Sequence, residues 1–160
     1  ANLLIGHRDL DSAADRAEVA KLWDVPAIPA RPGKTAIEMF EAVRRGEIKA
    51  LWIACTNPAQ SLPAQNAVRD ALANAELVVL QEAYADTETA PYADVLLPAA
   101  GWGEKEGTVT NSERRISRVR AAVEPPGEAR PDWRIACDFA MRLERRLHGQ
   151  AGDHHHRDHQ

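Results

Sequence analysis

Polar residues follow two short apolar runs of the sequence, at the point where each run ends. They are Thr56, Asn57 and Pro58 after the first run, and Gln81 and Glu82 after the second. Such groups hold ligands by hydrogen bonds, and an acidic residue after a strand can accept them from ribose hydroxyls. The same residues also have a purely structural explanation. On spacing alone residues 56–58 form a turn, because asparagine and proline favour turns, and the other two are solvated strand ends.

Cys55 lies beside these residues, between the first apolar run and the turn, and its thiol is a candidate nucleophile. A reactive thiol needs a neighbour that lowers its pKa, and no histidine lies near Cys55 in the sequence. A cysteine next to a buried strand is usually a small, inert hydrophobic residue. We therefore expect Cys55 to serve packing, and we assign no catalytic or metal-binding residue.

The apolar runs predict three buried strands, at residues 51–54, 77–80 and 95–97. Each run is too short for a helix and does not alternate in polarity, which is typical of parallel strands covered on both faces. Parallel strands end at one edge of a sheet, and ligands of open α/β sheets bind outside that edge. The candidate polar residues should therefore meet there.

Helix signals lie before and after the first strand. Thr35 and Glu38 have the spacing of a capping box, and Gly46 follows the expected end of that helix. A second helix is expected after Pro63, which gives a strand–helix–strand unit. The predicted fold class is α/β, with a Rossmann-like open, mostly parallel sheet flanked by helices. The apolar helix faces are Ile37, Phe40 and Val43 in the first helix, and Val68, Leu72 and Ala75 in the second.

The rest of the chain falls into segments that differ in their content of charged residues, glycine, proline and histidine. Residues 101–115 are charged and dotted with glycine, which predicts irregular structure, and Asp132 is expected to cap a last helix with the face Ile135, Phe139 and Leu143. Three segments follow from these signals. They are a preamble at 1–33 with a helix from Ser12 and a proline-rich connector, an α/β domain at 34–148, and a disordered, histidine-rich tail at 149–160.

Overall composition limits the function classes. With 160 residues and 44% hydrophobic content, the chain can bury one core. A net charge of -4 argues against a nucleic-acid partner. Two cysteines cannot supply the four thiolates that an iron–sulfur cluster usually takes. No apolar run is long enough to span a membrane, and we expect a cytoplasmic protein.

Several motifs stand in a fixed order along the chain. They are residues 49–53 followed by Thr56-Asn57-Pro58, residues 79–82, residues 93–98, the run 102–115 with Glu104-Lys105-Glu106-Gly107, and residues 125–133. This order resembles that of the molybdopterin oxidoreductases over about residues 1–148. Within that family the opening Gly6-His7-Arg8-Asp9 and the Glu-Lys-Glu-Gly run are most similar to assimilatory nitrate reductase catalytic subunits, rather than to formate dehydrogenases.

The resemblance implies a molybdenum cofactor, bis-molybdopterin guanine dinucleotide, held between two α/β domains of a larger multidomain enzyme. It assigns cofactor contacts to the strand-end residues, and it brings the loop 108–114 near the pterin and its phosphates, where short polar and guanidinium groups suit an anion. A plain polar loop explains residues 108–114 equally well. Cys55 stands where the family commonly has glycine, which matters if the backbone there has a positive φ. The implied contacts in the loop are Thr108, Thr110, Asn111, Glu113 and Arg114.

The implied function is to bind and orient this cofactor in an enzyme that reduces nitrate to nitrite, while the molybdenum cofactor does the chemistry. The iron–sulfur motif and the molybdenum-ligating region would lie outside this segment. The expected partners are the remaining domains and an electron-donor protein or domain. Two alternatives stay open: a free-standing nucleotide-binding or interaction module without catalysis, and a segment of the formate dehydrogenase type. No G-x-G-x-x-G follows a strand, which argues against a third class, the classical dinucleotide-dependent dehydrogenases.

Overall fold

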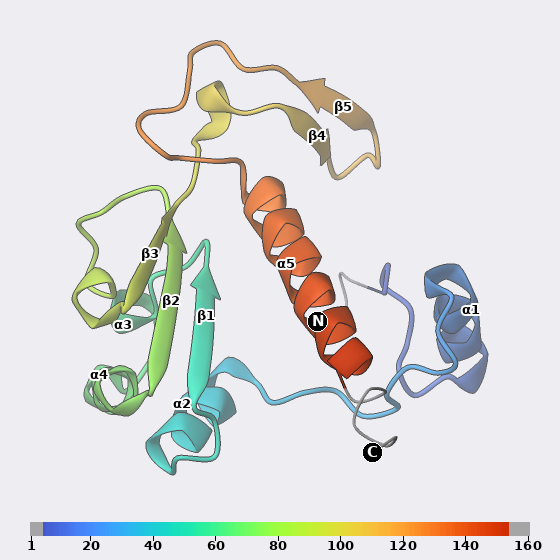
Figure 1. Cartoon of the computed structure of the whole chain (residues 1–160), viewed down its shortest axis with the longest axis horizontal. Helices are drawn as coiled ribbons and strands as arrows, with labels where there is room; N and C mark the ends of the chain where they lie inside the picture. The colour runs from blue at the N-terminus through green and yellow to red at the C-terminus, as the bar shows by residue number, and fades with distance from the viewer. Residues whose placement is uncertain (1–4, 154–160) are drawn as a thin grey trace.

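A three-stranded parallel sheet forms the centre of the fold in the computed structural model, which describes residues 5–153 (Figure 1). Its strands are β1 (Ala50–Ala54), β2 (Leu77–Glu82) and β3 (Val95–Pro98), in the order β1-β2-β3. The register pairs Ala54 with Gln81 and Glu82 with Pro98, so the three strands end at one edge. The predicted α/β class with parallel strands is confirmed.

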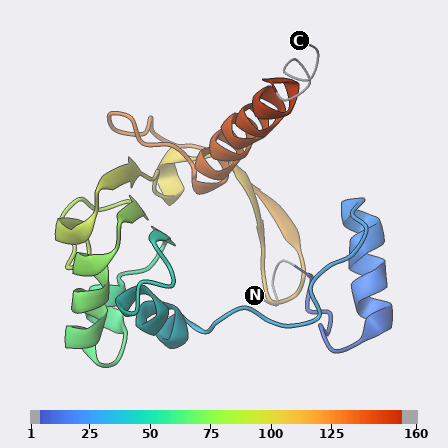
Figure 2. The same ribbon diagram turned by 60° about the horizontal axis from the view of Figure 1, so that its bottom comes forward.

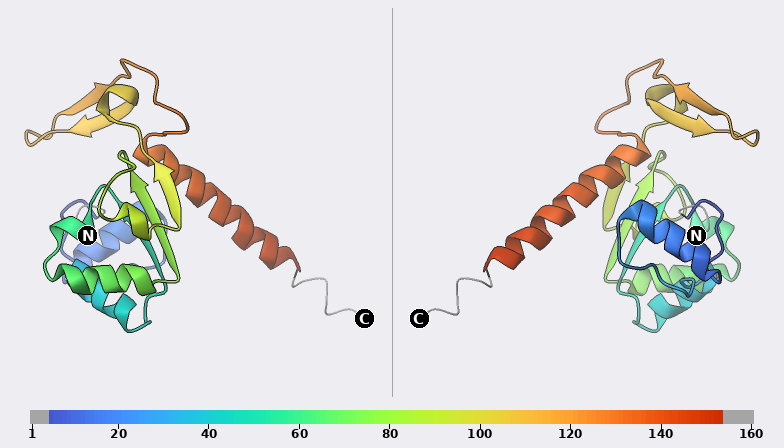
Figure 3. Two further views of the ribbon diagram at one scale, coloured as in Figure 1. Left: turned by 90° about the vertical axis from the view of Figure 1, so that its left-hand side faces the viewer. Right: turned by 90° about the vertical axis from the view of Figure 1, so that its right-hand side faces the viewer.

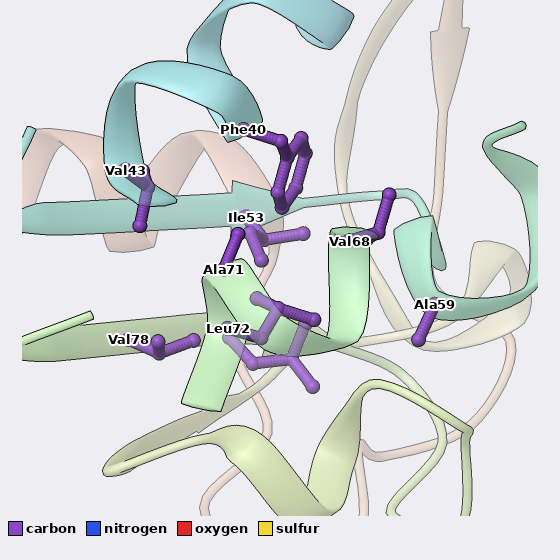
Figure 4. Packing of buried hydrophobic residues seen from close by; sticks show 9 residues of the cluster. Phe40, Val43, Ile53, Ala59, Val68, Ala71, Leu72 and Val78 are labelled. Carbon is purple, nitrogen blue, oxygen red and sulfur yellow. The ribbon is translucent and has the colours of Figure 1, made fainter. Parts of the chain in front are cut away.

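Two helices, α2 (Ala36–Arg44) and α4 (Gln65–Asn74), cover one face of this sheet. The capping box at the start of α2 is confirmed, because Glu38 N–H donates to Thr35 Oγ1 at 3.3 Å and Thr35 N–H donates to Glu38 Oε2 at 2.7 Å. Ile37 was predicted for the buried face of α2 and is 52% exposed, so that prediction is wrong. The core side chains, most of them labelled in Figure 4, are Phe40, Val43, Ile53, Ala59, Val68, Ala71, Leu72, Val78 and Leu80.

The opposite face of the sheet meets α5 (Asp132–Asp153), which diverges from the strands along its length (Figure 3). Ile135 is buried near the start of the helix, whereas Phe139 remains 50% exposed and Leu143 46% exposed. On the sheet, Trp52 is 39% exposed. The strands were predicted to be covered on both faces, and this face is only partly covered because α5 contacts it near one end.

Residues 101–115 were predicted to be irregular, and this prediction is wrong. A 3-10 turn at Trp102–Glu104 leads into β4 (Gly107–Thr110), which pairs antiparallel with β5 (Ile116–Val119). β-branched residues on both strands favour this pairing. Asn111 Oδ1 accepts from Arg115 N–H at 3.0 Å and closes the hairpin turn.

The chain returns to the sheet after the hairpin. Arg130 N–H donates to the carbonyl oxygen of Pro98 at 3.1 Å, and Ala100 N–H donates to the carbonyl oxygen of Arg130 at 2.8 Å. Ala99 and Arg130 form an isolated parallel bridge next to the end of β3. These bonds fix the point at which α5 starts beside the strand ends.

The N-terminal helix α1 (Ala13–Trp23) lies apart from the sheet, beyond the connector 24–35 (Figure 2). Its predicted cap is confirmed, because Asp15 N–H donates to Ser12 Oγ at 3.2 Å. A short 3-10 turn at Ala90–Tyr92 precedes β3. At the other end, α5 continues five residues into the segment predicted as a disordered tail, and residues 154–160 lie outside the described part. Within residues 5–153 no helix is long and apolar enough to cross a membrane.

Candidate functional site

The loop after β1 holds Cys55 in the left-handed region, with a φ of 60°. Its N–H donates to the carbonyl oxygen of Gln81 at 3.4 Å, which ties this loop to the end of β2. L side chains rarely adopt this conformation, whereas glycine adopts it freely. The positive φ that a family glycine would suit is therefore present at this position.

The Cys55 side chain is exposed, so the expected packing role is wrong. Its Sγ donates to Asp132 Oδ1 at 3.6 Å. Partial burial of the thiol, followed by the negative charge of Asp132, raises the pKa of Cys55 above its ordinary value. The group stays protonated near neutral pH and is a poor nucleophile.

Asn57 lies in the loop after β1 and links it by hydrogen bonds to the loop before β3. Its Nδ2 donates to Gln60 Oε1 at 3.2 Å and to the Glu88 carboxylate, and its Oδ1 accepts from Thr89 Oγ1 at 2.6 Å. Thr89 is fully buried and its Oγ1 accepts from Ala59 N–H at 3.2 Å. The Asn57 amide is thus engaged within the chain, where it holds the loop before β3 against the loop after β1.

Thr56 and Pro58 flank Asn57 and lie in different environments. Thr56 is exposed at the carboxyl edge of the sheet, whereas Pro58 is buried as the first residue of the short helix α3 (Pro58–Ser61). A proline fits that position because the first helical N–H has no partner within the helix. Of the predicted triplet, Thr56 presents its side chain to the solvent beside the strand ends.

Gln81 is a buried polar residue at the end of β2, with 4% exposure. Its Nε2 donates to Asp132 Oδ1 at 2.8 Å, and its Oε1 accepts from Trp52 Nε1 at 3.2 Å. The side chain therefore faces α5 and joins the sheet to the first turn of that helix.

Asp132 is the common partner of these strand-end groups. Lys105 Nζ lies 3.4 Å from Asp132 Oδ2 and 4.4 Å from the centre of the Trp102 ring. Burial acts to raise the pKa of Asp132, but hydrogen bonds from Gln81 and Lys105, together with the charge of Lys105, hold it below its ordinary value. The carboxylate is therefore ionised at neutral pH.

Glu82, the last residue of β2, has one carboxylate oxygen occupied and one open. Oε1 accepts from Ala83 N–H at 2.8 Å and from Tyr84 N–H at 3.3 Å. Among the described residues, Oε2 accepts no hydrogen bond. The local turn thus orients a carboxylate whose second oxygen is free to accept from a ligand.

The second set of predicted residues lies on the β4–β5 hairpin, away from the strand ends. The hairpin projects beyond the carboxyl edge of the sheet, with its turn at the far end (Figures 1 and 3). Arg114 has a φ of 60° in this turn, and its N–H donates to the carbonyl oxygen of Asn111 at 2.9 Å. The structure therefore does not gather the two predicted sets around one point. The exposed residues of this set are Thr108 and Thr110 on β4 and Asn111, Glu113 and Arg114 in the turn.

The base of the hairpin meets α5 around a small cavity of about 190 Å³. Trp133 Nε1 donates to the carbonyl oxygen of Glu106 at 2.9 Å, and a Cβ on Gly107 would lie 3.5 Å from the same indole nitrogen. Thr108, Lys105 and Asp132 also line this cavity. A second, apolar cavity of about 420 Å³ lies between α5 and the open face of the sheet. Across residues 5–153 no three His, Cys, Asp or Glu side chains come together as metal ligands.

Sequence reasoning missed Asp132, Lys105 and Trp52 as members of one network. Asp132 was predicted to cap the last helix, and this prediction is wrong: it is the first residue of α5, and its carboxylate accepts from Gln81 and Cys55 in other segments. Trp52 and Gln81 stand on neighbouring strands with a register offset of two, so both lie on the α5 face. Strand parity could have placed these two residues together, whereas no local signal points to Asp132.

The comparisons with known proteins agree with this fold. The family model described as molybdopterin oxidoreductase matches residues 7–142. The chain belongs to the molybdopterin oxidoreductase family. A nitrate reductase of Klebsiella oxytoca is 48% identical over 143 residues, which cover 89% of this chain. The assimilatory nitrate reductase catalytic subunit of Bacillus subtilis is 42% identical over 145 residues, again 89% of this chain. The resemblance inferred from the ordered motifs is confirmed.

Among solved structures, acetylene hydratase from Pelobacter acetylenicus matches with a TM-score of 0.56 and 26% sequence identity. The match covers 66% of this chain and 15% of that protein. The chain likewise spans only 16% of the Klebsiella enzyme and 20% of the Bacillus enzyme. This molybdopterin oxidoreductase segment therefore corresponds to a small part of its relatives.

Proposed function

We propose that this chain is the part of a nitrate reductase that binds the guanine dinucleotide arm of bis-molybdopterin guanine dinucleotide. Nitrate reductases at 42% and 48% identity support the substrate, and membership of the family supports a molybdenum–pterin cofactor. In the complete enzyme the cofactor would supply oxygen-atom transfer, in which nitrate, two electrons and two protons give nitrite and water. The residues of this chain would bind and orient the nucleotide.

The open oxygen of Glu82 carries this proposal. Ribose hydroxyls and the N1 and N2 groups of guanine are donors, and a carboxylate held with one oxygen free is a suitable acceptor. Glu82 lies at the carboxyl edge of a parallel sheet, where ligands of open α/β folds bind. The donor and acceptor set at this edge fits the nucleotide arm.

The other predicted contacts take different roles in this proposal. Thr56 would meet the nucleotide directly, because its side chain is exposed beside Glu82's edge. Asn57, Gln81 and Pro58 would act through the shape of the loops, since their side chains are engaged or buried within the chain. The hairpin residues would contact the pterin end or its phosphates, at a distance from the strand ends. They are Thr108, Thr110, Asn111, Glu113 and Arg114.

The remaining parts of the enzyme would complete the site. We assign the iron–sulfur cluster and the molybdenum ligands to those other domains, and we expect an electron-donor protein or domain and a cytoplasmic location. The assimilatory type is supported by the Bacillus relative. Activity with nitrate against activity with formate, measured on the complete enzyme, separates this proposal from a segment of the formate dehydrogenase type.

The direct test replaces Glu82 by Gln in the complete enzyme. The amide oxygen of Gln keeps an acceptor for Ala83 and Tyr84, while the free carboxylate oxygen becomes an amide donor. We expect lower guanine nucleotide and molybdenum content, with activity per bound molybdenum close to that of the wild type. The matched control is Glu76→Gln, an exposed carboxylate at the opposite end of β2 that pairs with Lys49. Full cofactor content in Glu82→Gln would contradict the proposed site.

A second candidate is a free-standing nucleotide-binding or interaction module. The free carboxylate oxygen of Glu82 suits it as well, because a guanine nucleotide alone can donate to that oxygen. Elemental analysis and a nucleotide-binding titration of the purified chain separate the two proposals. A module would bind guanine nucleotide alone with useful affinity, whereas one half of a two-domain site would bind it weakly.

A further inference from the structure

We infer that Asp132 is a positioning residue that holds the strand-end loops and the base of the β4–β5 hairpin in one arrangement. This inference rests on the function proposed above, because the two parts that Asp132 joins are those assigned to the nucleotide and to the pterin end. Asp132 itself has no assigned contact with the cofactor.

The geometry is that of a junction between three segments. Asp132 Oδ1 accepts from Gln81 on β2 and from Cys55 after β1, while Oδ2 faces Lys105 just before β4. These partners lie between 27 and 77 positions away in the sequence. Among the described residues, no side-chain hydrogen bond joins the ends of β1 and β2 directly to the segment before β4, so Asp132 is the side chain that bonds to both.

The junction is partly shielded from water, with Cys55 on its exposed side. Gln81 is 4% exposed, the Lys105 side chain 17% and the Asp132 side chain 34%. Removing the carboxylate would leave the Gln81 amide and the Lys105 ammonium without their partner, and such groups are costly to leave unpaired. Both segments would then move to recover hydrogen bonds with water.

Stabilisation of the helix dipole by Asp132 does not by itself account for these contacts. An acidic residue in the first turn is favoured by the helix dipole wherever it points. Here the carboxylate is turned toward donors from β2, from the loop after β1 and from the segment before β4. The neighbouring ion pair of Asp138 with Arg130 shows the contrast, since it joins α5 only to the residues just before the helix.

The first test measures amide hydrogen exchange in the full 160-residue chain. The reporters are the N–H groups of Cys55 and Glu104, which donate to Gln81 O and Gly101 O in the two joined parts. In Asp132→Ala we expect faster exchange at both, by about tenfold, because each part loses a charge-assisted bond. In Asp132→Asn, whose amide oxygen still accepts from Gln81, we expect faster exchange at Glu104 alone.

The matched control is Asp138→Ala, which removes a carboxylate from the same helix. Neither reporter should change in this variant. Faster exchange at only one reporter in Asp132→Ala, or equal changes in Asp138→Ala, would overturn the inference. This arm needs no cofactor, so its result is independent of the proposed function.

The second test compares Asp132→Ala with Val68→Ala in the complete enzyme. Val68 is 5% exposed in the core, so its truncation lowers stability without touching the junction. At a matched loss of melting temperature, we expect Asp132→Ala to lose guanine nucleotide several-fold more than Val68→Ala. Equal losses would mean that Asp132 acts through stability alone and would overturn its positioning role. Failure of the proposed function would instead show as full nucleotide content in Glu82→Gln.

Discussion

The rings of Trp52 on β1 and Phe139 on α5 meet edge to face, with centroids 4.9 Å apart and an interplanar angle of 81°. The two residues are 87 positions apart, and their contact is one of the few that hold α5 against the open face of the sheet. Edge-to-face pairs contribute beyond the area that they bury.

Replacing Phe139 by Ala should therefore loosen α5 from the sheet. We expect the free energy of unfolding to fall by about 1 to 2 kcal/mol, with a change in the tryptophan fluorescence as Trp52 gains solvent. Urea unfolding followed by fluorescence measures both quantities. Leu147→Ala, an exposed apolar residue farther along the same helix, should change neither, and a similar loss there would argue against the aromatic contact.

The backbone at Cys55 predicts an ordering of substitutions. The free energy of unfolding of Cys55→Gly should exceed that of Cys55→Ala by about 1 kcal/mol. The reason is that glycine adopts a φ near 60° without the steric cost that alanine has there. Both variants lose the thiol bond to Asp132, so that loss cancels in the comparison. Thermal unfolding of the two variants gives the difference, and an alanine variant as stable as the glycine variant would exclude strain at this position.

The lowered pKa of Asp132 predicts a contribution of this group to stability that depends on pH. A carboxylate whose pKa is lower in the folded chain stabilises the fold above its unfolded pKa, and this contribution is lost as the pH falls through the folded pKa. The stability difference between wild type and Asp132→Asn should therefore shrink as the pH is lowered from about 6 to 3. Urea unfolding at a series of pH values tests this, and a difference that stays constant would contradict it.

Replacing Asn57 should change the pKa of Glu88, a carboxylate 31 positions later in the sequence that accepts a hydrogen bond from Asn57. The hydrogen bond from Asn57 lowers the pKa of Glu88, so Asn57→Ala should raise that pKa toward its ordinary value. The same variant should lose about 1 to 3 kcal/mol of stability, because the buried Thr89 hydroxyl loses its acceptor. NMR titration of Glu88 measures the first effect. Gln60→Ala is the control, since Gln60 contacts Asn57 and not Glu88.

Local patterns predicted the sheet and most of its helices. The strands could be found because their apolar residues do not alternate, and α2 because Thr35 and Glu38 satisfy each other's backbone groups at a fixed spacing. The hairpin was missed because glycine and charge in residues 101–107 mask the β-branched residues that follow. Ile37 was assigned to the core wrongly, because helical spacing shows which residues share a face but not how much of that face other segments cover.

The candidate site could be predicted only where it depends on strand order. Glu82 ends β2 and Thr56 lies just after β1, and neighbouring parallel strands end at the same edge of the sheet. The role of Asp132 was beyond local reasoning, because an aspartate that caps a helix and one that accepts from Gln81, 51 positions earlier, look alike in sequence. Likewise, the full engagement of the Asn57 amide depends on a loop that returns 31 and 32 residues later.

The bonds between Arg130 and the end of β3 make the whole segment from 99 to 129 a closed excursion that leaves the sheet and returns to the same point. An insertion with fixed ends can change length at little cost to the rest of the molecule, since doubling a flexible loop costs only about 0.6 kcal/mol. The hairpin can therefore differ between relatives while the strands and their carboxyl edge stay the same. An exchanged segment would have to match the anchor points at residues 98–100 and 130 and the contacts of Lys105 and Glu106 with the first turn of α5.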